Sequence, residues 1–292
     1  LMASSILAQK NLTGPDALGV DKLPLLKEAA IAACDATDGV ADRVIGRPAA
    51  CKFDPAALQC AAGRKDMCLT PTEVAAAKRI YAGVVNKAGE VLFPGTGPGS
   101  EPLWGAYASP QFSIGTSYFR NVVAHDPTWD PATFDVDTDL ARAEAQDAGA
   151  GKAMDPDLSA FVARGGKLLT YHGTTDGLIP YGNSVNYYNS VVAKLGADKV
   201  QDHVALYLVP GMDHCAGGEG AFAVDWLGAL ESWEASGKPP ASLPGAHPVP
   251  PAGAPGAGGK PFTRPVCPYP QLPKYKGAGD EADAASWECA AE

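Results

Sequence analysis

The chain has 292 residues, which allows one large α/β domain or two smaller domains with a substantial core. Its formal net charge is −10 and no run of Lys and Arg forms a basic stripe, so neither nucleic acid nor an anionic membrane is expected as a partner. No apolar run approaches the roughly 20 residues that span a bilayer. Proline and glycine gather at 248–261, which predicts a linker or surface loop.

The first half of the chain predicts few regular elements. Residues 23–34 carry apolar side chains at helical spacing. Residues 70–85 predict a clear helix, because Thr70 is a suitable N-cap and Glu73 completes a capping box. Between 86 and 135 helical periodicity disappears, while glycine, proline and aromatic residues dominate. Such a long segment is predicted to bind or cover something rather than only to connect.

Helical and strand patterns alternate in the second half. The expected elements are a helix over 155–166 with Asp155 as its N-cap, a strand over 167–173, a helix over 183–196 and a strand over 203–211. Helices that alternate with short apolar strands predict a parallel sheet in an α/β fold. The change of pattern places a domain boundary near residue 155.

Two polar residues follow the two predicted strands. Asp176 lies in a glycine-flanked turn after the first strand, and His214 lies in the turn after the second. Because the C-terminal ends of parallel strands emerge at one edge of a sheet, these side chains are expected to meet. A carboxylate that holds an imidazole in one tautomer is two thirds of a Ser-His-Asp triad, and Asp before His is the order of α/β-hydrolases. The alternative is that Asp176 caps a turn and His214 is a surface histidine.

A serine nucleophile in a G-x-S-x-G elbow should precede Asp176, and the sequence contains none. Ser184 has the nearest pattern, but it follows Asp176 and lies at a helix start. His172, on the strand before Gly173, is expected to be structural rather than catalytic. The upstream serines without an elbow pattern are Ser4, Ser5, Ser100 and Ser117, and the histidines without a comparable setting are His125, His203 and His247.

Three aspartates gather around Gly39 within residues 34–51. Carboxylates so close together repel one another unless a cation neutralises them, and oxygen ligands suit Ca²⁺. Alternation points the carbonyls of Val40 and Val44 to the same side as Asp42. The spacing is not that of an EF-hand, and the alternative is a solvated acidic turn. The three acidic residues are Asp35, Asp38 and Asp42.

Cysteine usage predicts the compartment. No C-x-x-C pair indicates a zinc site, and six of the seven cysteines fall into neighbouring pairs that suit local disulfides. The protein is therefore expected to be secreted or periplasmic, the alternative being buried cytosolic thiols. The first residues have no basic region and too short an apolar run for a signal peptide, so the chain is expected to begin within a longer one. The odd cysteine is Cys215, beside His214.

Several segments match one family. They are CDATDGVADRVI, CLTPTEV, PGSEPLW, DLSAFVARGGKLLTYHGTTDGLIP, VPGMDHC, RPVCPYPQLPKYKG and ASWEC, spread from about residue 23 to 289. Together they resemble the tannase/feruloyl esterase family, which includes bacterial hydrolases of mono(2-hydroxyethyl) terephthalate. The resemblance implies the C-terminal part of an α/β-hydrolase core, 156–292, and a large calcium-binding lid domain, 1–155. It also implies a serine carboxylic ester hydrolase that acts on esters of aromatic (phenolic) acids, such as feruloyl or galloyl esters or terephthalate half-esters.

The resemblance assigns roles to residues. Asp176 and His214 match the triad positions, and Cys215 matches a cysteine that pairs with one preceding the nucleophilic Ser. The nucleophile and the oxyanion hole are therefore expected in a missing N-terminal portion, and the chain alone is expected to be inactive. Arg43 stands where the family often has Gly, and should leave the calcium site intact if its φ is not positive. The matches also include the disulfides Cys34–Cys51, Cys60–Cys68 and Cys267–Cys289 and the Ca²⁺ ligands Asp35, Asp38, Val40, Asp42 and Val44. Composition alone adds Trp104, Phe112, Tyr118 and Phe119 as guessed substrate contacts in the lid.

Two other functions stay open from the sequence. One is a truncated, non-catalytic calcium-binding lid and half-core fragment that only binds aromatic ligands. The other is a hydrolase-like protein that has lost catalysis and binds phenolic compounds. A Cys-Ser pair in upstream coding sequence would favour the hydrolase over the second of these.

Overall fold

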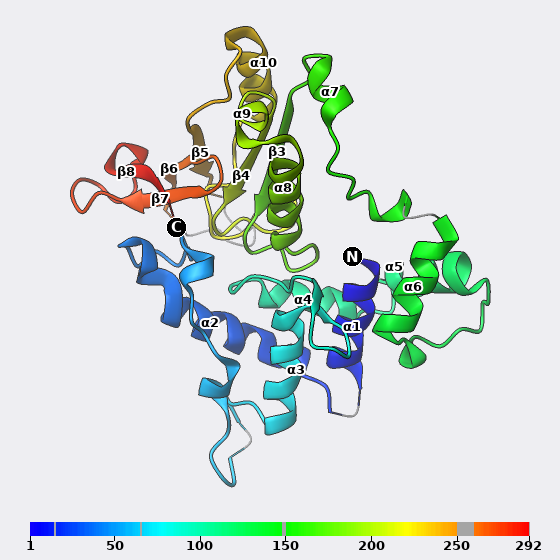
Figure 1. Ribbon diagram of the computed structural model, residues 1–292. Helices are drawn as coiled ribbons and strands as arrows, with labels where there is room; N and C mark the ends of the chain where they lie inside the picture. The colour runs from blue at the N-terminus through cyan, green and yellow to red at the C-terminus, as the bar shows by residue number, and fades with distance from the viewer. Residues whose placement is uncertain (15, 65, 148–149, 250–259, 292) are drawn as a thin grey trace. The chain divides into compact units, whose positions relative to one another are not determined.

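The structure, a computed structural model, describes residues 1–14, 16–64, 66–147, 150–249 and 260–291 (Figure 1). Most of the linker predicted at 248–261 lies outside the described residues. The fold is mixed α/β and divides into two compact units, each made of several chain segments. Unit 1 comprises Leu1–Ala29, Phe53–Met154 and Gly177–Asn183, and unit 2 comprises Ala30–Lys52, Asp155–Asp176 and Ser184–Glu292.

The units cut the chain differently from the division at residue 155 that the sequence indicated. A change of unit does fall between Met154 and Asp155. However, segment 30–52, which carries the acidic loop, belongs to unit 2, and segment 177–183 belongs to unit 1. The division into a 1–155 lid and a 156–292 core therefore stays a prediction.

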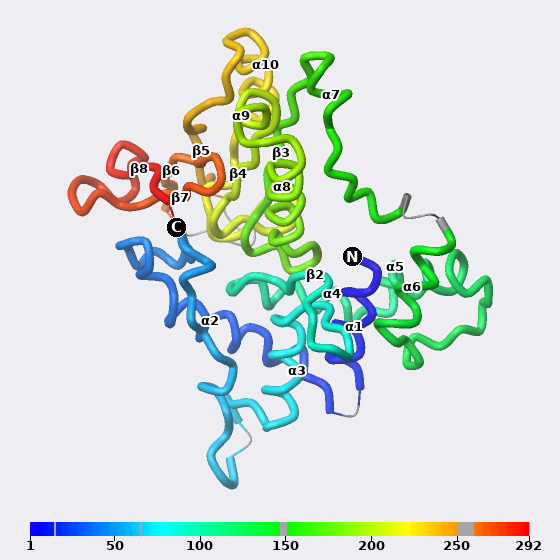
Figure 2. The backbone as a smooth tube through the Cα atoms, viewed as in Figure 1, coloured from blue at the N-terminus to red at the C-terminus, as the bar shows by residue number. Residues whose placement is uncertain are grey.

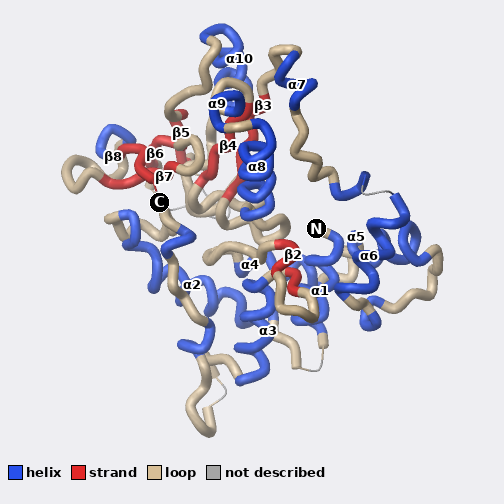
Figure 3. Tube along the Cα trace, in the orientation of Figure 1, coloured by secondary structure: helices blue, strands red, loops and turns tan. Residues whose placement is uncertain are grey.

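Unit 1 is mainly helical (Figure 3). In Figure 2, α1 (Met2–Thr13) lies close to α3 (Pro71–Ala82) and α4 (Glu101–Ala108). Their apolar faces bury a core that contains the fully buried Trp104. This unit also contains the antiparallel ribbon β1 (Val84–Val85) and β2 (Val91–Phe93), α5 (Ile114–Tyr118), the π-helical turn Phe119–Ala124 and α6 (Val136–Asp147).

The capping box at the start of α3 is confirmed. The hydroxyl of Thr70 accepts the amide of Glu73 at 3.2 Å, and the Glu73 carboxylate accepts the amide of Thr70 at 2.7 Å. These bonds satisfy two of the four amides that a helix start leaves without a partner. The predicted helix over 23–34 is also confirmed as α2 (Leu23–Cys34), which begins in unit 1 and ends in unit 2.

Short helices form between 86 and 135, where the sequence shows no helical periodicity. This segment contains α4, α5 and the π-helical turn that follows α5. The two α-helices have eight and five residues, too few turns for an apolar stripe to repeat in the sequence. Burial of Trp104 in α4 and of Phe119 in the π-helical turn, at 0% and 1% exposure and in separate clusters of unit 1, stabilises the segment instead.

Unit 2 contains the predicted parallel strand pair. β3 (Leu168–Gly173) and β4 (Val204–Val209) are aligned from Leu168 opposite Val204 to Gly173 opposite Val209. The connection includes α8 (Gly182–Leu195) and the short α9 (Ala197–Val200). Figure 1 shows α8 alongside the strand pair, where Val191 packs against Val204. All residues of β4 are buried, as expected for a strand in a parallel sheet.

The predicted N-cap of the helix before β3 was wrong. That helix, α7 (Ser159–Ala163), begins after Leu158, which makes no side-chain capping bond. The carboxylate of Asp155 instead accepts the amide of Asp157 at 2.9 Å, and Asp157 accepts the amide of Ser159 at 3.0 Å. Two successive Asx turns therefore occupy the residues where the sequence suggested the first helical turn.

The rest of unit 2 contributes α10 (Trp226–Ser236) and two antiparallel pairs. β5 (Leu243–His247) pairs with β6 (Phe262–Val266), and β7 (Gln271–Tyr275) pairs with β8 (Trp287–Ala291). The three expected disulfides, Cys34–Cys51, Cys60–Cys68 and Cys267–Cys289, are confirmed. Cys215 is an exposed free thiol in this structure. Among the described residues, no helix combines the length and apolarity needed to cross a membrane.

Candidate active site

Asp176 and His214 lie just after the C-terminal ends of β3 and β4 and contact each other as predicted. The Nδ1 atom of His214 is 2.9 Å from Oδ2 of Asp176. The Asp176 side chain is 4% exposed, whereas that of His214 is 38% exposed. A buried carboxylate therefore holds one nitrogen of an imidazole, and Nε2 is the nitrogen not bonded to it. This arrangement suits an imidazole that accepts a proton through Nε2.

The loops that carry this pair are tied together next to it. Thr175, which precedes Asp176, donates its hydroxyl to the carboxylate of Asp213 at 2.9 Å, and Asp213 precedes His214. A Cβ at Gly173 would lie 2.1 Å from the carbonyl oxygen of Met212, so only glycine allows this approach of the two loops. The contact between Asp176 and His214 is therefore fixed by backbone packing and a side-chain bond on adjacent residues.

A second histidine contacts the same carboxylate oxygen. Nε2 of His172 is 3.3 Å from Oδ2 of Asp176, and the His172 side chain is 12% exposed. Nδ1 of His172 is 2.8 Å from the hydroxyl oxygen of Ser184, near the start of α8. Sequence analysis assigned His172 a structural role and missed this contact. The available signal in the sequence was the position of His172 near the end of β3, four residues before Asp176.

The site lacks an attacking oxygen within the described part of the chain, which includes every serine. No serine hydroxyl is recorded at Nε2 of His214, and Ser184 is bonded to His172. Cys215 follows His214 directly and is exposed, with a positive φ of 66°. The described residues thus provide an acid–base pair without a positioned nucleophile.

The acidic loop lies in unit 2, and the pKa values of two of its aspartates, Asp35 and Asp38, are raised. Burial, assisted by the charges of Asp42 and Asp35, raises the pKa of Asp38 to about 7. Burial also raises the pKa of Asp35. The carboxylate of Asp42 pairs with Arg264 at 2.6 Å. Oxygen donors that repel one another in a partly buried loop fit a Ca²⁺ ion, whose charge would relieve the repulsion.

The loop does not form a converged metal cage. Across the described ranges, no group of three or more His, Cys, Asp or Glu side chains is arranged to hold a metal ion. The carboxylates instead accept backbone amides: Asp38 that of Val40 at 3.1 Å, and Asp35 that of Arg43 at 2.9 Å. A Cβ at Gly46 would lie 2.0 Å from Oδ2 of Asp38, so glycine is required there. The calcium site, including the carbonyls of Val40 and Val44, stays a prediction.

Arg43 adopts a backbone conformation that suits glycine. Its φ is +74°, so the condition set from the sequence, a φ that is not positive, is not met. The left-handed conformation costs a residue with a Cβ about 1–2 kcal/mol. The turn nevertheless directs the Arg43 amide to Asp35.

The guessed aromatic contacts lie in different parts of unit 1. Trp104 is fully buried in the core, and Phe112 packs edge-on against Tyr107 with ring centroids 5.1 Å apart. Tyr118 and Phe119 line a cavity of about 350 Å³, which suits a small aromatic molecule. Most of its lining is apolar, and Lys152 and Glu144 form an ion pair of 2.9 Å at its wall.

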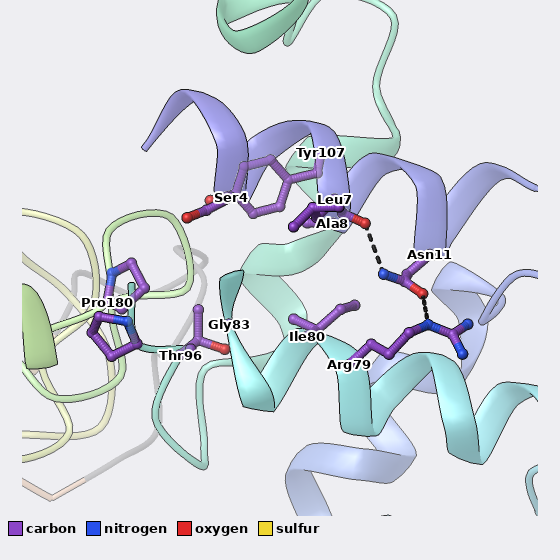
Figure 4. A pocket seen from close by; sticks show the side chains of 12 residues that line it. Ser4, Leu7, Ala8, Asn11, Arg79, Ile80, Gly83, Thr96, Tyr107 and Pro180 are labelled. Carbon is purple, nitrogen blue, oxygen red and sulfur yellow. Dashed lines mark hydrogen bonds between the residues drawn. The ribbon is translucent and has the colours of Figure 1, made fainter. Parts of the chain in front are cut away.

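A smaller cavity lies between α1, α3 and α4 (Figure 4). Its volume is about 20 Å³, room for about one water and too small for an ester substrate. The hydroxyls of Ser4 and Thr96 line it and are buried without a hydrogen-bond partner in the described structure. Arg79 donates to Asn11 at 2.6 Å beside it.

Unit 1 also contains a buried carboxylate, that of Glu101, whose side chain is fully buried. It accepts the hydroxyl of Tyr81 and, at 2.9 Å, the amide of Gly99. Burial raises the pKa of Glu101, and burial together with the Glu101 charge raises the pKa of Tyr81 well above its ordinary value. Its partner Tyr81 packs against the apolar core that contains Trp104.

Comparison with known proteins shows the family of this chain. A model of the family described as tannase and feruloyl esterase matches residues 3–290. The chain belongs to this family. It is 32% identical over 301 residues to the probable feruloyl esterase B-2 of Aspergillus terreus, and this match covers 95% of this chain and 56% of that protein. It is also 32% identical over 317 residues to the mono(2-hydroxyethyl) terephthalate hydrolase of Piscinibacter sakaiensis, covering 92% of this chain and 51% of that protein.

A solved structure of the same family has a similar fold. The crystal structure of feruloyl esterase B from Aspergillus oryzae superposes with a TM-score of 0.85 at 28% sequence identity. The superposition covers 99% of this chain and 61% of the Aspergillus oryzae chain. The chain spans about half the length of the curated relatives it matches.

Proposed function

We propose that this chain supplies the Asp and His of a serine carboxylic ester hydrolase that acts on small esters of aromatic acids. The observation that carries the proposal is the 2.9 Å contact between Nδ1 of His214 and the buried carboxylate of Asp176. It lies at the edge of a parallel strand pair, where hydrolases of the α/β class place their catalytic residues. Family membership supports the same reaction, and the names of the relatives, a probable feruloyl esterase and a terephthalate half-ester hydrolase, support the substrate class.

In the proposed reaction, Asp176 holds the proton of His214 on Nδ1 and leaves Nε2 as the acceptor. Nε2 takes the proton of a serine hydroxyl as the oxygen attacks the ester carbonyl, and then passes it to the leaving alcohol. Water then attacks the acyl-serine by the same proton transfers, which releases the aromatic acid and restores the serine. Because the described residues place no serine at Nε2, the proposal needs a serine from elsewhere in the complete gene product.

The remaining assignments belong to the same proposal. The chain would form the C-terminal part of an α/β-hydrolase core with a lid, and Cys215 would pair with a cysteine beside the serine. The aspartates and carbonyls of the acidic loop would bind a structural Ca²⁺. Of the guessed aromatic contacts, Tyr118 and Phe119 are carried forward, because they line the 350 Å³ cavity. Three disulfides favour a secreted or periplasmic protein.

The test compares residues 1–292 with the complete gene product on methyl ferulate, methyl gallate and a terephthalate half-ester. The complete product should turn over at least one ester, and residues 1–292 alone should not, because they position no serine. His214→Ala should abolish turnover. His203→Ala is the matched control, because the ring of His203 is bonded to the carbonyl of Gly166 and not to Asp176. Turnover that survives His214→Ala would contradict the proposed site.

A further inference from the structure

The carboxylate of Asp176 lies between two histidines that present different nitrogens to it. His214 directs Nδ1 to Oδ2 at 2.9 Å, and His172 directs Nε2 to the same oxygen at 3.3 Å. Of the two rings, that of His172 is the more buried, with 12% of its side chain exposed against 38% for His214. A carboxylate that is 4% exposed thus lies within reach of two ring nitrogens, which can both donate to it.

The two partners of His172 together fit one tautomer. The carboxylate of Asp176 only accepts, so the Nε2 atom that faces it carries a proton. Nδ1 of His172 is 2.8 Å from the hydroxyl oxygen of Ser184. A hydroxyl that donates to Nδ1 leaves the ring neutral with its proton on Nε2, and Nε2 faces Asp176. Both nitrogens of His172 then have a partner in the protein. His172 is therefore unsuited to take a proton from a substrate, whereas His214 has Nε2 directed away from Asp176.

We propose that His172 is a positioning residue: held by Ser184, it donates Nε2–H to Asp176 and fixes the carboxylate that orients His214. The inference rests on the proposed function, in which Asp176 orients the catalytic base. Each donor to a carboxylate restricts its rotation about the Cβ–Cγ bond, and His172 adds such a donor at Oδ2 of Asp176. The order of contacts is Ser184, His172, Asp176 and His214, all within unit 2.

The kinetic test uses the complete gene product with variants that differ in one hydrogen bond. His172→Phe keeps an aromatic ring of similar size and removes the donor, so kcat should fall by about 10- to 100-fold with KM unchanged, the range expected for a hydrogen bond to a charged group. His172→Gln restores an N–H donor and should recover part of kcat. Ser184→Ala leaves the His172 ring in place without the bond that orients it. Its kcat should lie between those of the wild type and His172→Phe. His203→Phe is the matched control and should keep full activity.

The spectroscopic test needs no substrate and uses residues 1–292. In ¹⁵N-histidine NMR spectra, His172 should carry its proton on Nε2 and His214 on Nδ1. His172→Phe should shift the Nδ1–H resonance of His214, and His203→Phe should not. Ser184→Ala provides a milder change if His172→Phe does not fold, and it should shift the same resonance.

The two tests separate the inference from the function on which it rests. Full kcat in His172→Phe would overturn the positioning role while leaving the esterase proposal intact. A His172 ring that is doubly protonated, or protonated on Nδ1 alone, would overturn it as well. If no ester is turned over but the predicted tautomers and the shift are found, the proposed function fails and the hydrogen-bond chain stands.

Discussion

Two buried carboxylates, Glu101 in unit 1 and Asp176 in unit 2, differ in what holds them. Glu101 in unit 1 is fully buried and bonded to the Tyr81 hydroxyl and the Gly99 amide, within an apolar core. Asp176 in unit 2 is 4% exposed and bonded to an imidazole, that of His214, whose side chain is 38% exposed. Burial of a carboxylate therefore does not by itself mark an active site. What distinguishes Asp176 is a partner that can exchange a proton and that reaches solvent.

The largest expected effect is on kcat of the complete gene product, when the carboxylates of Asp176 and Glu101 are each replaced by an amide. Asp176→Asn should lower kcat by about 10⁴-fold, because the amide no longer fixes the catalytic tautomer of His214. Glu101→Gln should leave kcat unchanged once the protein is folded, because Glu101 contacts no reacting group. Steady-state kinetics on methyl ferulate at matched concentrations of folded enzyme measures both. Equal losses of kcat in the two variants would remove the distinction between the carboxylates.

The acidic loop contains another buried carboxylate, Asp38, whose charge is opposed by two neighbouring aspartates. If Ca²⁺ relieves this repulsion, the ion should stabilise the folded protein by about 2.7 kcal/mol at 100 times its dissociation constant. Melting curves in Ca²⁺ and in chelator measure this, together with metal analysis of the purified protein. Asp38→Asn should remove most of the response, and exposed Asp16→Asn should keep it. No bound calcium and an unchanged melting temperature would contradict the calcium proposal.

The pH dependence of stability should report the environment of Glu101. Its pKa in the folded protein is raised above the ordinary value of 4.5 by burial. As pH rises from about that value, the unfolded chain loses this proton first, so the folded state becomes less stable until the folded pKa is passed. The free energy of unfolding should fall by about 1.4 kcal/mol for each unit between the two pKa values.

Chemical denaturation of the wild type and Glu101→Gln across this pH range isolates the contribution of Glu101 as the difference between their free energies of unfolding. The variant should lose this part of the pH slope, and exposed Glu90→Gln should keep it. An identical slope in the wild type and Glu101→Gln would show that the carboxylate titrates as if it were exposed.

The smallest expected effect is a change in stability when Arg43, whose amide is bonded to Asp35, is replaced. Arg43 adopts a φ of +74°, and its amide is bonded to Asp35 at 2.9 Å. Arg43→Gly should relieve the steric cost of this conformation and stabilise the protein by about 1 kcal/mol. Arg43→Ala, which keeps a Cβ, is the matched control and should not stabilise it. Urea denaturation measures both, and a destabilised Arg43→Gly would mean that the arginine side chain contributes more than its backbone costs.

The sequence predicted those parts of the site that depend on local pattern and strand order. Apolar strands separated by a helix placed Asp176 and His214 at one edge, and the contact is present. The role of His172 was missed. Its spacing of four residues from Asp176 was the only local signal, and Ser184 reaches its ring only when the start of α8 is folded.

Fold details were missed where tertiary packing or turn chemistry outweighed local signals. The helix α4 is stabilised by burial of Trp104 rather than by a repeating stripe. Asp155 forms an Asx turn with Asp157, which competes with the helix cap that its sequence position suggests. The capping box of Thr70 and Glu73 was predictable because both of its bonds are local.

The central claim is that Asp176 and His214 act as one unit. A double-mutant cycle on kcat of the complete gene product tests it most directly, with Asp176→Asn, His214→Ala and the two combined. Residues that act together are strongly non-additive, so the double variant should be no slower than His214→Ala alone. If the two losses instead multiply in the double variant, the residues act independently, and the catalytic pair proposed here is wrong.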